Sequence, residues 1–163
     1  MTRDARRARC YDAERLIFRL MERPGGGAHT VELAGTTLTL PGEARFGSVE
    51  SVQRYVDEVL ALPAVRERFA RAARPVRVRD RRSAAAAHYS RDDATIAIPA
   101  GHPDRWAMRE LAVLHELAHH LDDDGVPAHG LGFTGTLTEL AGLVLGPETG
   151  LVYRVILGDA GLL

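Results

Sequence analysis

The chain has 163 residues, a formal net charge of −1 at pH 7 and 45% hydrophobic residues, which is an ordinary composition for one globular domain. The near-zero charge provides no general attraction to nucleic acid or to an anionic membrane, and no apolar run is long enough to span a bilayer. A single cysteine excludes an internal disulfide, and no apolar segment follows the basic N-terminus, so we expect a cytoplasmic protein.

The first part of the chain predicts helices and one hairpin. Residues 4–23 have the pattern of an arginine-rich amphipathic helix, stopped by Pro24-Gly25-Gly26-Gly27. Residues 30–33 and 36–40 alternate in hydrophobicity around Ala34-Gly35, as in a β-hairpin. Ser48 is a good N-cap for a helix that continues to Leu62, and Pro63 opens a further helical stretch to about Ala73.

Three short strands are predicted next, at residues 75–79, 84–89 and 94–98, with a turn at 91–93. The last strand directly precedes another predicted helix. It could be an open edge that pairs with an extended peptide, or its apolar residues could fill the core while the edge is covered.

Eight arginines lie within residues 66–82. They could form a patch for an anionic ligand, but we favour a solvated surface because the aromatic residues and glycines of nucleic-acid modules are missing.

Residues 103–122 predict a helix that carries His115-Glu116-Leu117-Ala118-His119, which is an H-E-x-x-H motif. The helix should start at Pro103 or Asp104 and stop before Gly125. Helix positions i and i+4 differ by about 40° of rotation and about 6 Å of rise, so both imidazoles can bind one zinc ion. Glu116 can reach a metal-bound water as a general base. The alternative is that His115 and His119 bind no metal and are ordinary helix histidines with hydrogen-bond partners.

A catalytic zinc ion needs a third protein ligand and an open position for water. The candidates downstream are His129, the aspartates 122–124 and Glu139, whereas His120 should point away from the ion. We favour His129, because nearby glycines and a proline let the chain turn back towards the helix. The aspartates could form a solvated turn or contact a ligand histidine. Two more helices are expected, at 131–145 and after Gly146-Pro147.

The segments HELAHH and PAHGLGF resemble the SprT-like branch of zincin metalloproteases, in which HExxH is followed by a spacer and a His-Gly-x-x-aromatic segment. Nearly the whole chain also resembles a small actinobacterial family of HExxH metallohydrolases. The matching stretches are RDARRARCYDAERL, TLTLPGEARFGSVESVQRYVDEVLALP, AAAAHYSRDDATIAIP, HELAHH and PAHG. The resemblance implies a zinc-dependent hydrolase with His115, His119 and His129 as ligands and Glu116 as the base. Many SprT-like proteins carry an appended four-cysteine zinc ribbon, which a chain with only Cys10 cannot form, so DNA-repair roles that depend on such a module are not implied.

These observations predict an α+β fold, namely a minimal zincin-like domain over residues 1–163 with a small mixed sheet and an active-site helix. We expect a zinc metallopeptidase that acts on a peptide or protein, with Glu116 as general base. The alternatives are a non-catalytic binding module stabilised by Zn²⁺ and a hydrolase that acts on something other than a peptide. Glu116 favours the enzyme, since a purely structural site does not need it. Neither a membrane nor nucleic acid is expected as a partner, and the sequence indicates no oligomeric state.

Overall fold

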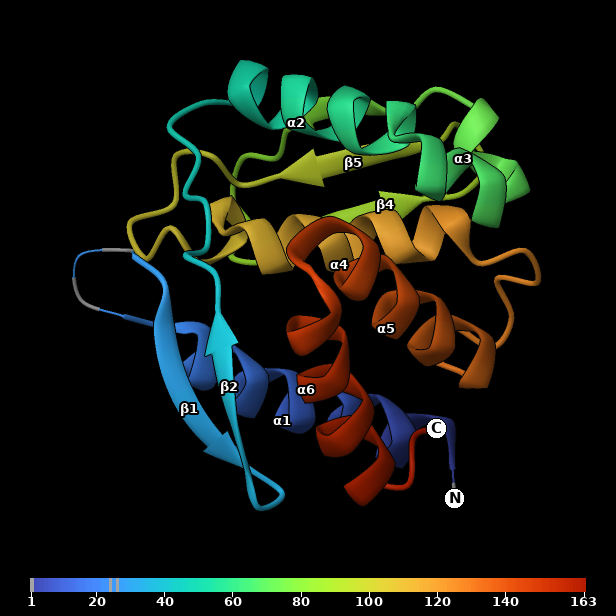
Figure 1. Cartoon of the computed structure of the whole chain (residues 1–163). Helices are drawn as coiled ribbons and strands as arrows, with labels where there is room; N and C mark the ends of the chain where they lie inside the picture. The colour runs from blue at the N-terminus through green and yellow to red at the C-terminus, as the bar shows by residue number, and fades with distance from the viewer. Residues whose placement is uncertain (1, 24, 26) are drawn as a thin grey trace. The chain divides into compact units, whose positions relative to one another are not determined.

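The computed structural model describes residues 2–23, 25 and 27–163, and its contacts divide the chain into two compact units. The central unit is Ala44–Asp123, and the terminal unit combines Met1–Glu43 with Asp124–Leu163. Helices and small sheets are both present, which confirms the predicted α+β class (Figure 1). That residues 1–163 act as a single domain stays a prediction.

The central unit is built on a three-stranded sheet with the order β3-β5-β4. Strand β3 (Arg77–Asp80) runs parallel to β5 (Thr95–Ile98), and β4 (His88–Ser90) runs antiparallel to β5. Helix α2 (Val49–Ala61) contacts β3, and helix α4 (Glu110–Leu121) contacts β4. Figure 1 shows β4 and β5 running between these two helices. The small mixed sheet predicted from the sequence is therefore present.

Strand β5 is the middle strand of this sheet, so the possibility that it forms an open edge was wrong. It is hydrogen-bonded to β3 on one side and to β4 on the other, and all four of its residues are buried. The alternative, that Thr95, Ile96 and Ile98 fill the core, is confirmed. A strand buried on both faces and both edges requires such a continuous apolar run.

Helix α2 begins as predicted at Ser48, whose side chain accepts a hydrogen bond from the Ser51 amide in a reciprocal capping box. The helical stretch predicted from Pro63 to about Ala73 is interrupted. It consists of α3 (Pro63–Arg68) and a 3-10 turn, η1 (Ala70–Ala73), separated by Phe69 in an extended conformation. Phe69 is buried. Burying that ring outweighs the local preference for a continuous helix.

The helix predicted from Pro103 to Asp122 is shorter, because α4 begins only at Glu110. A 3-10 turn, η2 (Trp106–Met108), precedes it, and Arg105 has a left-handed backbone. The Arg105 guanidinium donates hydrogen bonds to the carbonyls of Ala100, Phe46 and Gly47. In addition, the amide of Phe46 bonds to the carbonyl of Met108, which an α-helix would need for itself. These tertiary contacts override the helical periodicity, and Trp106, within the predicted helix, is exposed.

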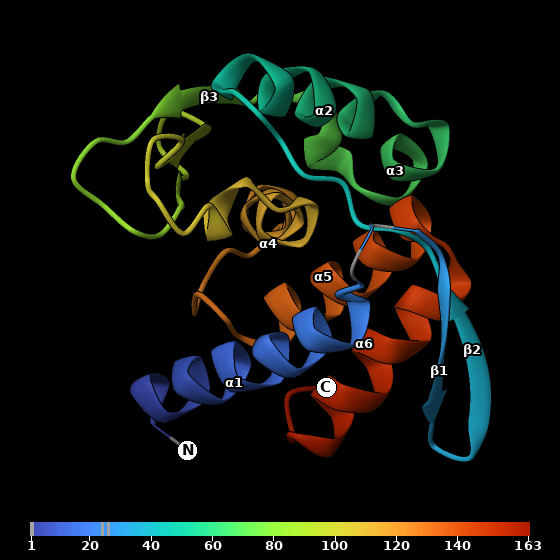
Figure 2. The same ribbon diagram turned by 90° about the vertical axis from the view of Figure 1, so that its left-hand side faces the viewer.

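The described residues of the terminal unit form three helices and a hairpin (Figure 2). They are α1 (Arg3–Met21), β1 (His29–Leu33), β2 (Thr36–Leu40), α5 (Leu131–Leu145) and α6 (Pro147–Asp159). The hairpin is confirmed, and both of its turn residues have the positive φ that a type I′ turn requires. Of the glycine-rich stop predicted after α1, Pro24 and Gly26 lie outside the described residues.

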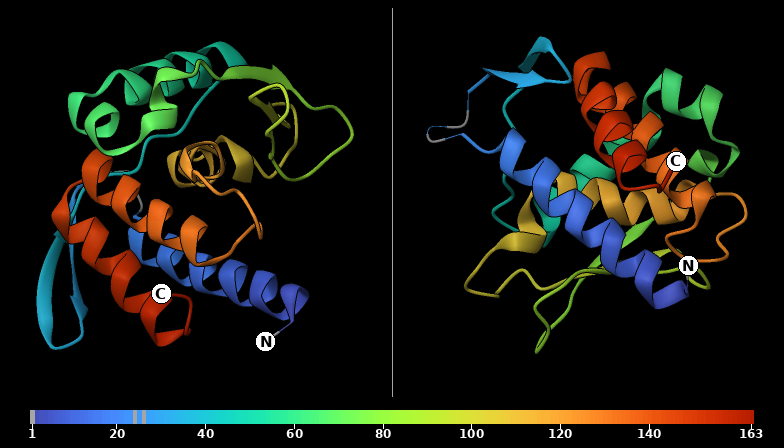
Figure 3. Two further views of the ribbon diagram at one scale, coloured as in Figure 1. Left: turned by 90° about the vertical axis from the view of Figure 1, so that its right-hand side faces the viewer. Right: turned by 90° about the horizontal axis from the view of Figure 1, so that it is seen from below.

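Helices α5 and α6 lie side by side and are joined at Gly146, which has a φ of 98° (Figure 3). They approach closely at two glycines, since a Cβ on Gly150 would lie 2.9 Å from the Cα of Gly142. The bounds predicted for these helices, 131–145 and after Gly146-Pro147, are confirmed. Among the described residues, no helix combines the length and the apolar character that a membrane crossing requires.

Candidate metal centre

His115 and His119 lie on one face of α4, as their spacing predicted. Their Nε2 atoms are 3.2 Å apart, and the ring planes are inclined by 74°. Two nitrogens that bind one tetrahedral zinc ion at about 2.0–2.1 Å must lie about 3.3–3.4 Å from each other. The pair therefore has the spacing that two ligands of a single ion need.

The start of α4 is fixed by a buried carboxylate in its first turn. Glu110 accepts hydrogen bonds from the Ala44 amide (2.7 Å) and from the Tyr55 hydroxyl (2.6 Å). A negative charge at this end also interacts favourably with the helix dipole. The contacts hold the helix that carries both histidines at a defined place within the central unit.

Two arginines hold the other end of α4. Arg91 donates hydrogen bonds to the carbonyls of His119 (3.5 Å), Asp122 (2.9 Å) and Asp123 (2.6 Å), and Arg71 donates to the carbonyl of His120 (2.5 Å). The last carbonyls of a helix have no hydrogen-bond partners within the helix. Cationic donors at this end satisfy those carbonyls and also interact favourably with the negative end of the helix dipole. The sequence offered no signal for these partners, because they come from segments distant along the chain.

His120 points away from the histidine pair, as expected. Its Nδ1 lies 2.8 Å from the Tyr89 hydroxyl, and its Nε2 lies 3.0 and 3.1 Å from the carbonyl oxygens of Arg71 and Arg74. Because carbonyls only accept, Nε2 must carry the hydrogen and Nδ1 accepts from the tyrosine. Burial lowers the pKa of His120 to about 4, so the ring is neutral near pH 7. Its role is structural.

Glu116 follows His115 in the same helix and is only 8% exposed. A carboxylate seldom lies buried in a helix without a partner or a task. Its position in the sequence of α4, between the two histidines, is that of the general base in an H-E-x-x-H motif. That catalytic role stays a prediction.

His129 belongs to the terminal unit, where it is 7% exposed and lies in a tight turn before α5. Its φ is 62°, a left-handed conformation that is uncommon for histidine. The amide of Gly130 bonds to the carbonyl of Pro127, and a Cβ on Gly130 would meet that oxygen at 2.8 Å, so the turn requires glycine there. The imidazole lies beside two aromatic rings, with centroid distances of 5.3 Å to Tyr11 and 4.9 Å to Phe133.

Three histidines, His115, His119 and His129, lie close enough to bind a metal ion, since one ring nitrogen from each lies within 4.8 Å of the others. Within the described part of the chain, no carboxylate belongs to this cluster. Asp123 and Asp124 are exposed, whereas Asp122 is buried and Glu139, on α5, is half-buried. The set brought together is the one favoured from the sequence.

The arginines of residues 66–82 are largely exposed, which agrees with the solvated surface favoured from the sequence, and Arg77 and Arg79 lie on the exposed side of β3. Several of the others donate to backbone carbonyls. Arg66 bonds to the carbonyl of Leu60, and Arg74 bonds to that of Asp92. The run thus serves partly to satisfy backbone acceptors at the ends of elements, a function that its spacing did not reveal.

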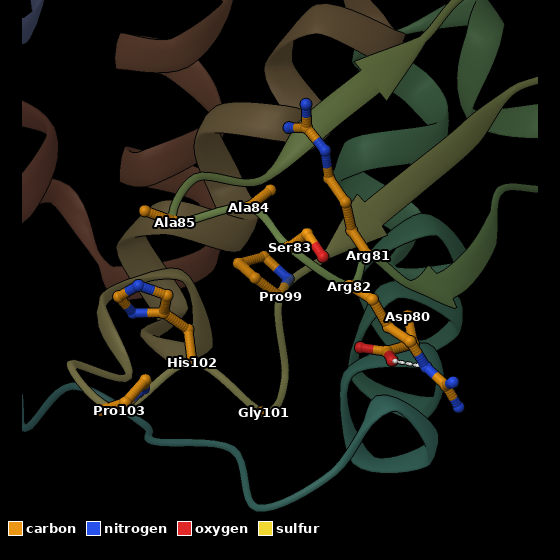
Figure 4. A pocket seen from close by; sticks show the side chains of 10 residues that line it. All are labelled: Asp80, Arg81, Arg82, Ser83, Ala84, Ala85, Pro99, Gly101, His102 and Pro103. Carbon is orange, nitrogen blue, oxygen red and sulfur yellow. Dashed lines mark ion pairs between the residues drawn. The ribbon is translucent and has the colours of Figure 1, made fainter.

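A separate cavity of about 580 Å³ lies in the central unit between the segments that follow β3 and β5 (Figure 4). The residues that line it are Asp80, Arg81, Arg82, Ser83, Ala84, Ala85, Pro99, Gly101, His102 and Pro103. Its ionisable side chains already have partners: Arg82 lies 3.7 Å from Asp80, and the His102 Nδ1 lies 2.9 Å from the Asp104 carboxylate. Arg81 donates to the carbonyl of Ala86. The cavity therefore presents no converging set of polar groups.

Comparisons with models of protein families, with curated proteins and with solved structures found no match. A functional assignment therefore depends on the chemistry of the donor set and on its geometry.

Proposed function

We propose that this chain is a zinc-dependent hydrolase, a metallopeptidase that cleaves an amide bond in a peptide or protein. The observation that carries the proposal is the cluster of His115, His119 and His129, with ring nitrogens within 4.8 Å of one another. Two of the three come from an H-E-x-x-H motif on a largely buried helix next to a small mixed sheet. This combination supports a zincin-like site of the SprT-like kind, which the sequence resembles.

The donor set suits Zn²⁺. Imidazole nitrogen is among the ligands that zinc prefers in proteins, and the 3.2 Å between the Nε2 atoms of His115 and His119 fits a tetrahedral ion. Three protein ligands is also the number typical of catalytic zinc sites, which leave the fourth position for water or substrate. A structural site would close that position with a fourth protein ligand, so the three-histidine cluster favours catalysis over the binding-module alternative.

Each side chain has a defined task in the proposed reaction. His115, His119 and His129 hold the metal through their ring nitrogens. When bound, Zn²⁺ polarises the scissile carbonyl and lowers the pKa of water at the site to about 7. The Glu116 carboxylate takes a proton from the attacking water and passes it to the leaving nitrogen. The Glu110 side chain ties the first turn of α4 to the Ala44 amide, and Arg91 bonds to the carbonyls at the other end, so together they keep the helix that carries Glu116 in place.

The test is the substitution Glu116→Gln, which keeps the shape of the side chain and removes its basicity. Zinc content by elemental analysis and cleavage of a proteome-derived peptide library would be measured for the parent and for the variant. We expect one zinc per chain in both proteins and a loss of turnover of about 10²–10⁴-fold in the variant, the usual contribution of a general base. Glu139→Gln, on α5, serves as the matched control and should change neither quantity.

Undiminished turnover in the Glu116 variant would remove this residue from the mechanism. A parent protein that cannot be loaded with stoichiometric zinc would contradict the metal site itself. A parent that binds one zinc but cleaves no peptide in the library would instead favour the zinc-stabilised binding module.

A further inference from the structure

Helix α1 supplies a charged group to the turn that carries His129. The guanidinium of Arg6 donates from Nε to the carbonyl of His129 (2.9 Å) and from Nη2 to the carbonyl of Leu162 (3.2 Å). Both bonds lie within the terminal unit and are partly buried. One side chain near the start of the chain thus joins the His129 turn to the segment after α6.

The Leu162 end of this bridge is a firm anchor. Leu162 is fully buried, and its amide donates to the carbonyl of Leu157 (2.9 Å). Its carbonyl also accepts a hydrogen bond from the Thr134 hydroxyl, in the first turn of α5 (2.5 Å). The arginine is therefore held against a residue that two other hydrogen bonds fix, and it can fix a second group in turn.

The His129 end of the bridge is a position that needs such support. A histidine with a φ of 62° occupies a sparsely populated region, which persists only when surrounding contacts impose it. Hydrogen bonds from a charged donor are roughly twice as strong as neutral ones, so Arg6 is well suited to impose it. The ring is restrained separately, by Tyr11 on α1 and Phe133 on α5.

We propose that Arg6 is a positioning residue that holds the backbone of His129 in its left-handed conformation, and so presets the imidazole for metal binding. The inference rests on the proposed function, in which His129 is the third zinc ligand. Arginine suits this position because its planar fork presents Nε–H and Nη2–H at a fixed separation that matches the two carbonyls, whereas lysine places its donors on a single nitrogen at the end of a flexible chain. Loss of a group that orients a metal ligand typically lowers metal affinity by about 10- to 100-fold.

The experiment is a competition titration of Zn²⁺ against a chelator of known affinity, using the full chain purified free of metal. The proteins are the parent, Arg6→Met, Arg6→Lys, His129→Ala and the double variant Arg6→Met/His129→Ala. Arg19→Met changes an exposed arginine of the same helix and serves as the matched control. Absorption of the Co²⁺-loaded proteins reports the ligand geometry independently of affinity and activity.

We expect Arg6→Met to bind zinc about 10- to 100-fold more weakly than the parent, and Arg19→Met to bind it like the parent. Arg6→Lys should also bind more weakly, and it carries the comparison if Arg6→Met does not fold. In the His129→Ala background, Arg6→Met should have no further effect, because its influence passes through His129. A Co²⁺ spectrum that changes in Arg6→Met but not in Arg19→Met would support the same conclusion.

Two results would overturn the inference and leave the proposed function standing. One is an Arg6→Met protein that binds zinc as tightly as the parent, while His129→Ala binds it weakly. The other is an equal loss of affinity in both backgrounds, which would show a general structural role for Arg6. If His129→Ala retained the parent affinity, or the parent bound no zinc, the proposed ligand set would fail first and this inference would fail with it.

Discussion

The contact between Gly142 and Gly150 makes a sharp prediction about stability. A Cβ at position 150 would lie 2.9 Å from the Cα of Gly142, whereas ordinary carbon contacts are about 3.5–4.0 Å. The atom that it meets is backbone and cannot rotate away, so α5 and α6 would have to separate by about 0.6–1.1 Å. Because α5 begins two residues after His129, such a shift also moves the end of that turn.

Two substitutions on α6 isolate this effect. Alanine favours a helix over glycine by about 0.5–1 kcal/mol, a gain that both Gly150→Ala and Gly158→Ala receive. Only Gly150→Ala also carries the cost of overpacking, about 1–3 kcal/mol, because a Cβ at Gly158 would meet nothing within 4 Å. The free energies of unfolding of the two variants should therefore differ by about 1–3 kcal/mol, with Gly150→Ala the less stable.

Urea unfolding of the metal-free proteins, followed by circular dichroism, would measure this difference. Gly142→Ala is a further control, since its Cβ would lie 3.5 Å from the Cα of Gly150, an ordinary contact. If Gly150→Ala and Gly158→Ala were equally stable, the close approach of the two helices would not constrain the fold, and the reasoning would be refuted.

Three further predictions concern the site and its surroundings. The pKa of His120 is about 4 in the folded protein against an ordinary 6.5. Because the unfolded chain takes up a proton at this ring more readily, the free energy of unfolding should be highest above pH 6.5. It should fall by up to about 3 kcal/mol as the pH drops to 4. Urea unfolding between pH 4 and 7 should show a shallower pH slope in His120→Gln, and an unchanged slope would contradict the assignment. Chelator competition should find zinc affinity strongly reduced in His129→Ala and nearly unchanged in Asp123→Ala; the reverse order would exclude our ligand set. The arginines of residues 66–82 should bind duplex DNA no more tightly than the non-specific range of about 10⁻⁴–10⁻⁶ M, and a much tighter, salt-dependent affinity in a filter-binding assay would revive a nucleic-acid function.

Local chemistry made several elements predictable. Ser48 caps α2 because a hydroxyl at that position satisfies a free amide, and Gly146-Pro147 separates α5 from α6 because glycine allows a positive φ and proline opens a helix. The relation between His115 and His119 is likewise a property of helix geometry, so the sequence determines it wherever α4 forms. These features depend on residues within about one helical turn of one another.

The features that the sequence mispredicted depend on distant residues. The start of α4 was placed too early because Arg105 bonds to carbonyls of residues 46 and 47, far away in the chain. The hydrophobicity pattern of β5 could not place it in the middle of the sheet, because an apolar strand has the same pattern whether its edges are open or paired.

What the sequence alone determined is the pair on α4, namely two imidazoles one helical turn apart with a carboxylate between them, whereas it only favoured His129 among several candidates for a third group. Only the tertiary structure decided what holds these groups, because Arg91 on the carbonyls of α4 and Arg6 on the carbonyl of His129 approach from other segments. Hydrogen bonds from arginine side chains to backbone carbonyls have no characteristic spacing in the sequence, so they cannot be predicted from it. Any arginine can bond to any carbonyl that the fold brings near it.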